Sequence, residues 1–140
     1  MKRLCVIDGQ GGGIGALIIK KLKERFGESV EILALGTNAI ATAQMLKAGA
    51  NRGATGENPV LRMAEEVDLI LGPISITWPN AMMGELTPAM AEAIMSSSAH
   101  KILVPLHQER VSIVAASKEP LPHLVEAMMN EYLNEELRDV

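Results

Sequence analysis

Hydrophobic residues occur along this chain in two arrangements: short continuous runs and longer stretches with a helical period. Residues 4–7 form an apolar run that ends at a glycine cluster, which is typical of a strand buried on both faces of a sheet. In residues 13–26, apolar positions recur at helical spacing and charged residues occupy the other side. This segment is therefore predicted to be a helix that ends at Gly27.

The alternation of strand-like and helix-like segments continues to the end of the chain. Asn58 and Thr87 each precede a proline, and a capping side chain followed by proline is a typical helix start. Thr37 or Asn38 caps an earlier helix that ends at Gly49. Further strands are predicted at residues 30–35, 67–71, 101–106 and 111–115, with a very short one within 49–56. Further helices are predicted at residues 59–66, 88–98 and 122–137.

This order of elements predicts a mostly parallel sheet, because each right-handed crossover returns the chain to the same sheet. Only residues 107–110 join the last two strands, which suits an antiparallel hairpin at the sheet edge. We therefore expect one α/β domain over residues 1–140. Its three-layer αβα arrangement would contain a Rossmann-like, mostly parallel sheet with an antiparallel edge hairpin.

A glycine-rich loop, Asp-Gly-Gln-Gly-Gly-Gly-Ile-Gly at residues 8–15, lies between the first strand and the first helix. Nucleotide-binding folds place phosphate there, because glycines allow close approach and the free amides of a helix start attract an anion. Asp8 would repel a pyrophosphate unless its side chain turns into the loop to accept amide hydrogen bonds. A glycine-rich turn that serves only tight packing is the alternative.

The glycine spacing resembles a known cofactor fingerprint. Gly9, Gly13 and Gly15 satisfy Gly-x-x-x-Gly-x-Gly, which is similar to the loop of the short-chain dehydrogenases and reductases over the first βαβ unit. The resemblance implies NAD or NADP as the cofactor. Tyr132 is followed four positions later by Glu136, so the Tyr-x-x-x-Lys of that family has no counterpart. Dehydrogenase chemistry is therefore not expected.

The end of the second predicted strand, residues 36–38, also departs from that pattern. It offers no carboxylate for a ribose diol and no arginine for a 2′-phosphate, so the choice between NAD and NADP stays open. Over nearly its whole length the chain resembles a family of small bacterial proteins of unknown function. The resemblance is carried by residues 8–15, 35–38, 45–50, 53–58 and 72–74, and it implies that these loops belong together.

Ligands of open parallel sheets bind outside the carboxyl ends of the strands, where the strand order reverses. The glycine loop, the end of the second strand and residues 72–75 would surround one crevice there, with Thr37 or Asn38 near a ribose. The predicted cofactor-binding residues are Gly9, Gln10, Gly11, Gly12, Gly13, Ile14, Gly15, Gly36, Thr37, Asn38, Gly72 and Pro73. No catalytic residue is identified.

Composition narrows the function further. A net charge of −4 and an aromatic content of 2% do not suit a nucleic-acid binder. Cys5, the only cysteine, is predicted to be an inert core residue in a reducing compartment, and the three histidines lack metal-ligand spacing, so no metal is expected. The chain has neither a signal-peptide core nor a run of membrane-spanning length, so we expect a cytoplasmic protein without membrane contact.

Two functions remain open at this point. The chain is a nucleotide or dinucleotide-binding module, or it is a small enzyme acting on a phosphorylated or nucleotide substrate. In the second case polar groups at the loops would carry the chemistry, namely Thr37, Asn38, Glu57, Asn58 or Ser75. A third hypothesis is that the protein is an interaction scaffold with a vestigial pocket. Trp78 and the methionines at residues 82–95 indicate exposed apolar area and hence a homodimer.

Overall fold

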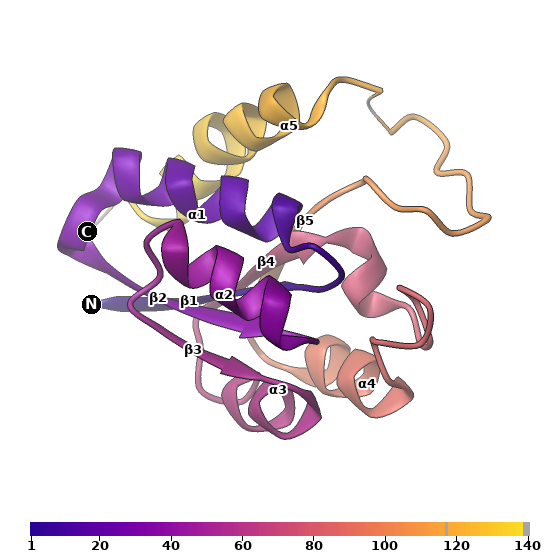
Figure 1. Ribbon diagram of the computed structural model, residues 1–140. Helices are drawn as coiled ribbons and strands as arrows, with labels where there is room; N and C mark the ends of the chain where they lie inside the picture. The colour runs from indigo at the N-terminus through magenta and orange to yellow at the C-terminus, as the bar shows by residue number, and fades with distance from the viewer. Residues whose placement is uncertain (117, 139–140) are drawn as a thin grey trace.

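Five parallel strands form the centre of the protein, in a computed structural model that describes residues 1–116 and 118–138 (Figure 1). The strand order is β3-β2-β1-β4-β5, and every neighbouring pair is parallel. The strands are β1 (Lys2–Asp8), β2 (Val30–Gly36), β3 (Arg52–Thr55), β4 (Leu69–Pro73) and β5 (His100–Val104). Parallel strands are usually covered on both faces, which explains why β1, β2 and β4 are largely apolar, whereas the edge strand β3 is mostly exposed.

Helices cover both faces of this sheet, as Figure 1 shows. One layer contains α1 (Gly13–Phe26), α2 (Ala39–Lys47) and α5 (Leu121–Ala127), which continues as the π-helical η3 (Met128–Leu133) and α6 (Asn134–Glu136). The other layer contains α3 (Glu57–Met63) and α4 (Pro88–Ser96). Two short 3-10 helices, η1 (Gly27–Ser29) and η2 (Ile74–Thr77), follow α1 and β4. The expected α/β arrangement is confirmed.

Each face of the sheet has its own apolar core. Leu4 and Val6 pack in the layer of α1 and α5, while Cys5 and Ile7 pack in the layer of α3 and α4. All four side chains are 0% exposed, and full burial of a large apolar side chain contributes about 1.5–3 kcal/mol. Burial raises the pKa of the Cys5 thiol to about 12. That thiol is therefore protonated at neutral pH and unreactive.

The predicted antiparallel edge hairpin is wrong. β5 pairs with β4 in parallel and ends at Val104, and residues 105–116 form an irregular loop. Val111 and Val114 are 44% and 94% exposed, so the segment buries no apolar face that would hold it on the sheet. Ala115 also has a φ of 66°, which interrupts an extended backbone. The helix predicted at residues 122–137 and the short strand within 49–56 are both present.

The order of the strands fixes where a ligand site belongs. The chain proceeds from β1 through β2 to β3 on one side, and then α3 leads back to β4 on the other side of β1. The strand order therefore reverses between β1 and β4, and a crevice is expected at their carboxyl ends.

Among the described helices, none combines the length and apolar character that crossing a membrane requires.

Candidate functional site

A crevice of about 410 Å³ lies at the carboxyl ends of β1 and β4. That volume falls within the range of small-molecule sites. Its lining residues are Asp8, Gln10, Ile14, Pro73, Ser75, Met82, Met83, Leu106, His107, Gln108 and Glu109. The crevice thus combines apolar walls with carboxylate, hydroxyl and imidazole groups.

Asp8 is the last residue of β1 and is only 4% exposed. Its Oδ1 accepts a hydrogen bond from the amide of Gly9 at 2.8 Å, and its Oδ2 accepts one from the amide of Gly15 at 2.7 Å. The carboxylate therefore turns back into the glycine loop. Burial raises the pKa of Asp8, and this effect outweighs the amide hydrogen bonds from Gly15, Gly9 and Ile14; the charge of Glu85 also raises it.

A second carboxylate, that of Glu85, contacts the glycine loop from the segment between β4 and α4. Glu85 Oε1 accepts hydrogen bonds from the amide of Gln10 at 2.8 Å, the hydroxyl of Thr37 at 2.7 Å and Nδ2 of Asn38 at 2.8 Å. Burial tends to raise the pKa of Glu85, but these hydrogen bonds together outweigh it and lower the pKa. Glu85 is therefore ionised at neutral pH.

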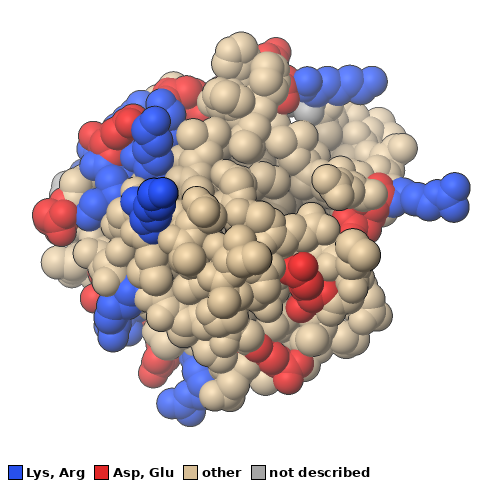
Figure 2. All heavy atoms as spheres, in the orientation of Figure 1, with Lys and Arg blue, Asp and Glu red and all other residues tan. Residues whose placement is uncertain are grey.

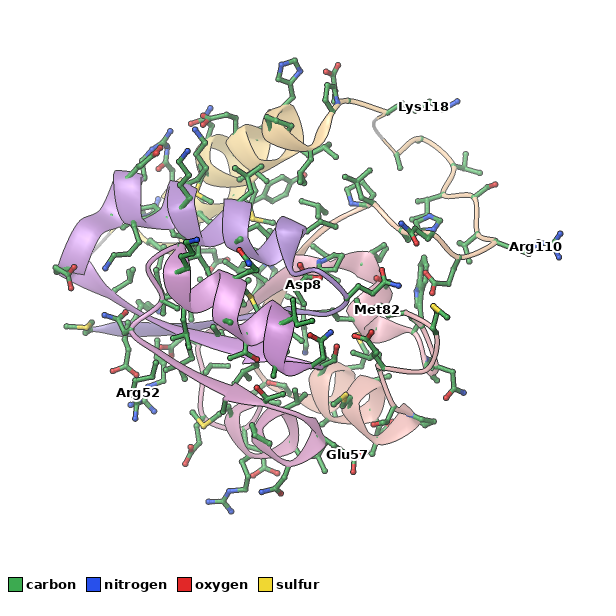
Figure 3. The ribbon with its side chains drawn as sticks, viewed as in Figure 1. Asp8, Arg52, Glu57, Met82, Arg110 and Lys118 are labelled. Atoms are coloured by element: carbon green, nitrogen blue, oxygen red, sulfur yellow. The ribbon has the colours of Figure 1, made fainter. Side chains whose placement is uncertain are left out.

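These contacts leave few donors for a phosphate. The amide of Gly12 donates to the carbonyl of Gly9 at 2.9 Å, in addition to the amides that Asp8 and Glu85 hold. Neither lysine nor arginine is among the described residues that line the crevice. In Figure 2, cationic side chains at this end of the sheet are confined to two projecting tips, which match the outward-pointing Arg110 and Lys118 of Figure 3. A pyrophosphate would find two carboxylates here and no counter-charge.

Most of the glycines in the loop are required by packing inside the protein. A Cβ at Gly9 would lie 2.6 Å from the Met82 Sδ, and one at Gly15 would lie 2.5 Å from the Met45 Sδ. Gly12 has a φ of 74°, and its Cβ would lie 2.8 Å from the Ala41 Cα. Tight packing, the alternative explanation of the loop, accounts for these positions.

Gly11 and Gly13 differ from the other loop glycines. A Cβ at either position would meet nothing within 4 Å, and both residues are exposed. Neither has the positive φ that favours glycine. Neither packing nor backbone conformation therefore requires glycine at these two positions.

Met82 and Met83, in the segment of residues 78–86, line the crevice, and this segment is locally strained. Asn80, Met82 and Met83 have φ values of 66°, 60° and 60°, a left-handed backbone that asparagine tolerates and methionine rarely adopts. The Met82 amide donates to Glu109 Oε1 at 2.9 Å, which links this wall to the loop after β5. Figure 3 shows Asp8 and Met82 at the same end of the sheet. Backbone strain of this kind often accompanies a functional site.

His107 in the loop after β5 is held in a defined orientation. Its ring meets the Trp78 ring edge-on, with centroids 4.9 Å apart and planes at 69°. Its Nδ1 lies 3.1 Å from the carbonyl oxygen of Glu109. Because a carbonyl only accepts, we assign the proton to Nδ1, which leaves Nε2 as the ring nitrogen for a ligand. Sequence reasoning missed this residue because the loop was predicted to be a hairpin.

The predicted site residues fall into two groups. Gln10, Ile14 and Pro73 line the crevice, as does Ser75, whereas Thr37 and Asn38 lie behind Glu85. The Asn38 side chain also caps α2 through the Ala41 amide at 2.8 Å and donates to the Gln10 carbonyl at 2.9 Å. The ribose contact of Thr37 or Asn38 stays a prediction, because their polar groups already have partners in the protein.

Gly36 and Gly72 serve packing, and Glu57 lies elsewhere. A Cβ at Gly36 would lie 2.1 Å from the Thr42 Oγ1, and one at Gly72 would lie 2.4 Å from the Ile7 carbonyl oxygen. Glu57 accepts a hydrogen bond from the Thr87 hydroxyl at 2.5 Å, at the starts of α3 and α4. Within residues 1–116 and 118–138, no group of three histidine, cysteine or acidic residues is placed to hold a metal ion.

Comparisons with known proteins give a family but no activity. The family model described as "Domain of unknown function (DUF3842)" matches residues 3–137. A comparison with curated proteins gives no match. Among solved structures, a dodecameric FMN-dependent Ubix-like decarboxylase from Escherichia coli O157:H7 is similar, with a TM-score of 0.49 and 14% identity. That alignment covers 92% of this chain and 75% of the decarboxylase chain.

The predicted cofactor, NAD or NADP, is wrong. Within this chain, Asp8 and Glu85 hold the Gly9, Gln10 and Gly15 amides that a pyrophosphate would need. The glycine spacing resembled a dinucleotide fingerprint because tight strand-to-helix packing and phosphate binding both require glycine.

Proposed function

This chain belongs to the DUF3842 family, and from that premise we propose that it is a module that binds a small molecule in the crevice between β1 and β4. The proposed ligand is a nucleoside-sized molecule that carries hydroxyl or N–H donors and no phosphate. The observation that carries the proposal is the lining itself. Acceptor groups face the crevice between apolar walls, and its described lining residues include no lysine or arginine.

The walls suit the two parts of such a ligand. Ile14, Pro73 and Leu106 offer apolar contacts for a flat ring. The carboxylates of Asp8 and Glu109 offer acceptors for hydroxyl groups, because each carboxylate oxygen accepts more than one hydrogen bond. Carboxylates hold ribose hydroxyls in the same way in dinucleotide-binding folds.

Nucleoside binding and two histidine variants test this proposal. Thermal shift with adenosine, guanosine, cytidine and uridine should reveal stabilisation by at least one of them. His107→Ala should weaken nucleoside binding about tenfold, because the ligand loses its hydrogen bond to Nε2 of His107. His123→Ala is the matched control, since His123 lies on the exposed side of α5, where its ring contacts Glu119. Binding that is equal in both variants, or no stabilisation by any nucleoside, would contradict the proposal.

A small enzyme is the second candidate, and one observation favours it. Asp8 and His107 line the same crevice, and burial holds the pKa of Asp8 above its usual range. A carboxyl group with a raised pKa in the same crevice as an oriented imidazole is a common arrangement for proton transfer. Mass spectrometry of a bound nucleoside before and after incubation separates the two functions. An unchanged ligand favours the binding module, and a converted one favours the enzyme.

A further inference from the structure

One oxygen of Glu85 receives three hydrogen bonds, from two segments that are far apart in the sequence. The donors are the backbone amide of Gln10 in the glycine loop, the hydroxyl of Thr37 and the side-chain amide of Asn38, at 2.7–2.8 Å. Thr37 and Asn38 follow the carboxyl end of β2. Three converging donors of this kind form a site for one oxygen of an anion, and here a side chain of the protein fills it.

We propose that Glu85, which lies next to the crevice and contacts its lining residue Gln10, determines ligand specificity there by occupying this oxyanion site and so excluding anionic ligands. The proposal rests on the proposed function for the class of ligand that the crevice admits. It adds that a carboxylate or phosphate group is refused because its donors are already satisfied and because the resident charge repels it. Removing the carboxylate should therefore create a site for a small oxyanion that the wild-type protein lacks.

The segment that carries Glu85 is fastened at more than one point. A Cβ at Gly9 would lie 2.6 Å from the Met82 Sδ and 2.9 Å from the Glu85 Oε1, so the segment rests directly on the glycine loop. The Met82 amide is held by Glu109 at 2.9 Å. Truncation of Glu85 alone therefore leaves residues 78–84 anchored, and the three donors stay in place for an added anion.

The test uses acetate, which reproduces the missing carboxylate. Amide spectra of ¹⁵N-labelled wild type, Glu85→Ala and Glu85→Gln are recorded with increasing sodium acetate, against sodium chloride at equal ionic strength. Inorganic phosphate is the second probe. Glu66→Ala is the matched control, because Glu66 is exposed and lies at the other side of the fold, between α3 and β4.

In Glu85→Ala, acetate and phosphate should shift the Gln10 amide with an affinity about tenfold or more above that of wild type and Glu66→Ala. Glu85→Gln should bind both anions more weakly than Glu85→Ala does, because its amide oxygen still fills the donor set although the repelling charge is gone. Equal affinity in wild type and Glu85→Ala would overturn the proposal. So would a folded Glu85→Ala whose Gln10 amide signal does not shift with either anion. Because neither probe is a nucleoside, this result is independent of whether the crevice binds one.

Discussion

Asp8 accepts the backbone amide hydrogen bonds that a ligand phosphate would accept in a dinucleotide-binding loop. Its two carboxylate oxygens accept the amides of Gly9 and Gly15 at 2.8 and 2.7 Å, so the loop is organised by a charge of the chain itself. Because the side chain is 4% exposed, this charge is held in a poorly solvated place. The folded state therefore favours the protonated carboxyl more than the unfolded state does.

The free energy of unfolding should depend on pH through the titration of the Asp8 carboxyl. Because folding raises the pKa of Asp8, its favourable contribution is complete below the ordinary aspartate pKa and is lost as the pH rises through the folded value. Each unit of pKa difference corresponds to about 1.4 kcal/mol. Urea unfolding of wild type and Asp8→Asn across acidic pH should show wild type losing stability relative to the variant as the pH rises. A difference that is flat or grows with pH would contradict the raised pKa.

Two adjacent glycines separate the structural and functional explanations of the loop. Gly12→Ala should lose about 2 kcal/mol or more of unfolding free energy, because the left-handed backbone and the Ala41 backbone at 2.8 Å both oppose a Cβ. Gly13→Ala should change stability by less than about 0.5 kcal/mol or raise it, because its Cβ meets open space at the start of α1. Urea denaturation measures both. Equal losses of unfolding free energy in the two variants would contradict this distinction between Gly12 and Gly13.

At the scale of elements, the long segment between β4 and α4 departs most from ordinary backbone geometry. Met82 and Met83 share a φ of 60°, but Met82 is 7% exposed and Met83 is 96% exposed. The pair therefore separates backbone strain from packing. The segment also carries Glu85, so its conformation sets the position of the carboxylate against the glycine loop.

Glycine substitutions at these methionines should have opposite effects. Met83→Gly should raise the unfolding free energy by up to about 1 kcal/mol, because it relieves a left-handed backbone without removing a buried side chain. Met82→Gly should lower it by about 2 kcal/mol or more, because the lost packing outweighs the same relief. Chemical denaturation of the two variants decides this. A loss of stability in Met83→Gly would show that its backbone is not strained.

The sheet was predictable from sequence because its chemistry is local. Residues 4–7 are a continuous apolar run, and residues 30–35 and 67–71 are apolar apart from one acidic residue each. Thr87 caps α4, which begins at Pro88 as predicted, whereas α3 begins at Glu57, two residues before the predicted start at Pro59. The loop after β5 was not predictable in this way. Val111 and Val114 favour a strand by their side chains, yet both are exposed, and only the tertiary structure shows that no neighbouring strand receives them.

The site was only partly predictable, because its decisive contacts join distant residues. Glycine spacing and strand order located the crevice, and Asp8 was expected to turn into the loop if it was to avoid repelling a ligand. The contact of Glu85 with Gln10 spans 75 residues, and no spacing rule connects the two. Left-handed methionines likewise have no signature in the sequence, because this conformation is ordinarily expected of glycine or asparagine.

At the scale of the whole molecule, the homodimer expected from the sequence stays a prediction. A second groove of about 500 Å³ lies along β5, α5 and η3, and Tyr132 in it is 53% exposed. An apolar groove beside an exposed edge strand suits association with a second copy. Sedimentation at micromolar concentration should show a dimer that Tyr132→Glu weakens. A wild-type protein that sediments only as a monomer would contradict the expectation.

The charge of the whole molecule also affects which ligands can approach the crevice. The chain has a net charge of −4, and Arg110 and Lys118 project outward from the loop that follows β5 (Figure 3). The net negative charge opposes an anionic ligand at long range in the same sense as Asp8 and Glu85 do at close range. A neutral or cationic ligand meets no such barrier.

The most direct measurement compares a nucleoside that binds the wild-type protein with its own 5′-monophosphate, by titration of ¹⁵N amide spectra. The nucleoside should shift the amides of Ser75, His107 and Glu109, and its monophosphate should bind about tenfold or more weakly, because the described lining holds no lysine or arginine and few free donors for the phosphate. Tighter binding of the monophosphate, with shifts centred on the amides of residues 9–15, would contradict this account.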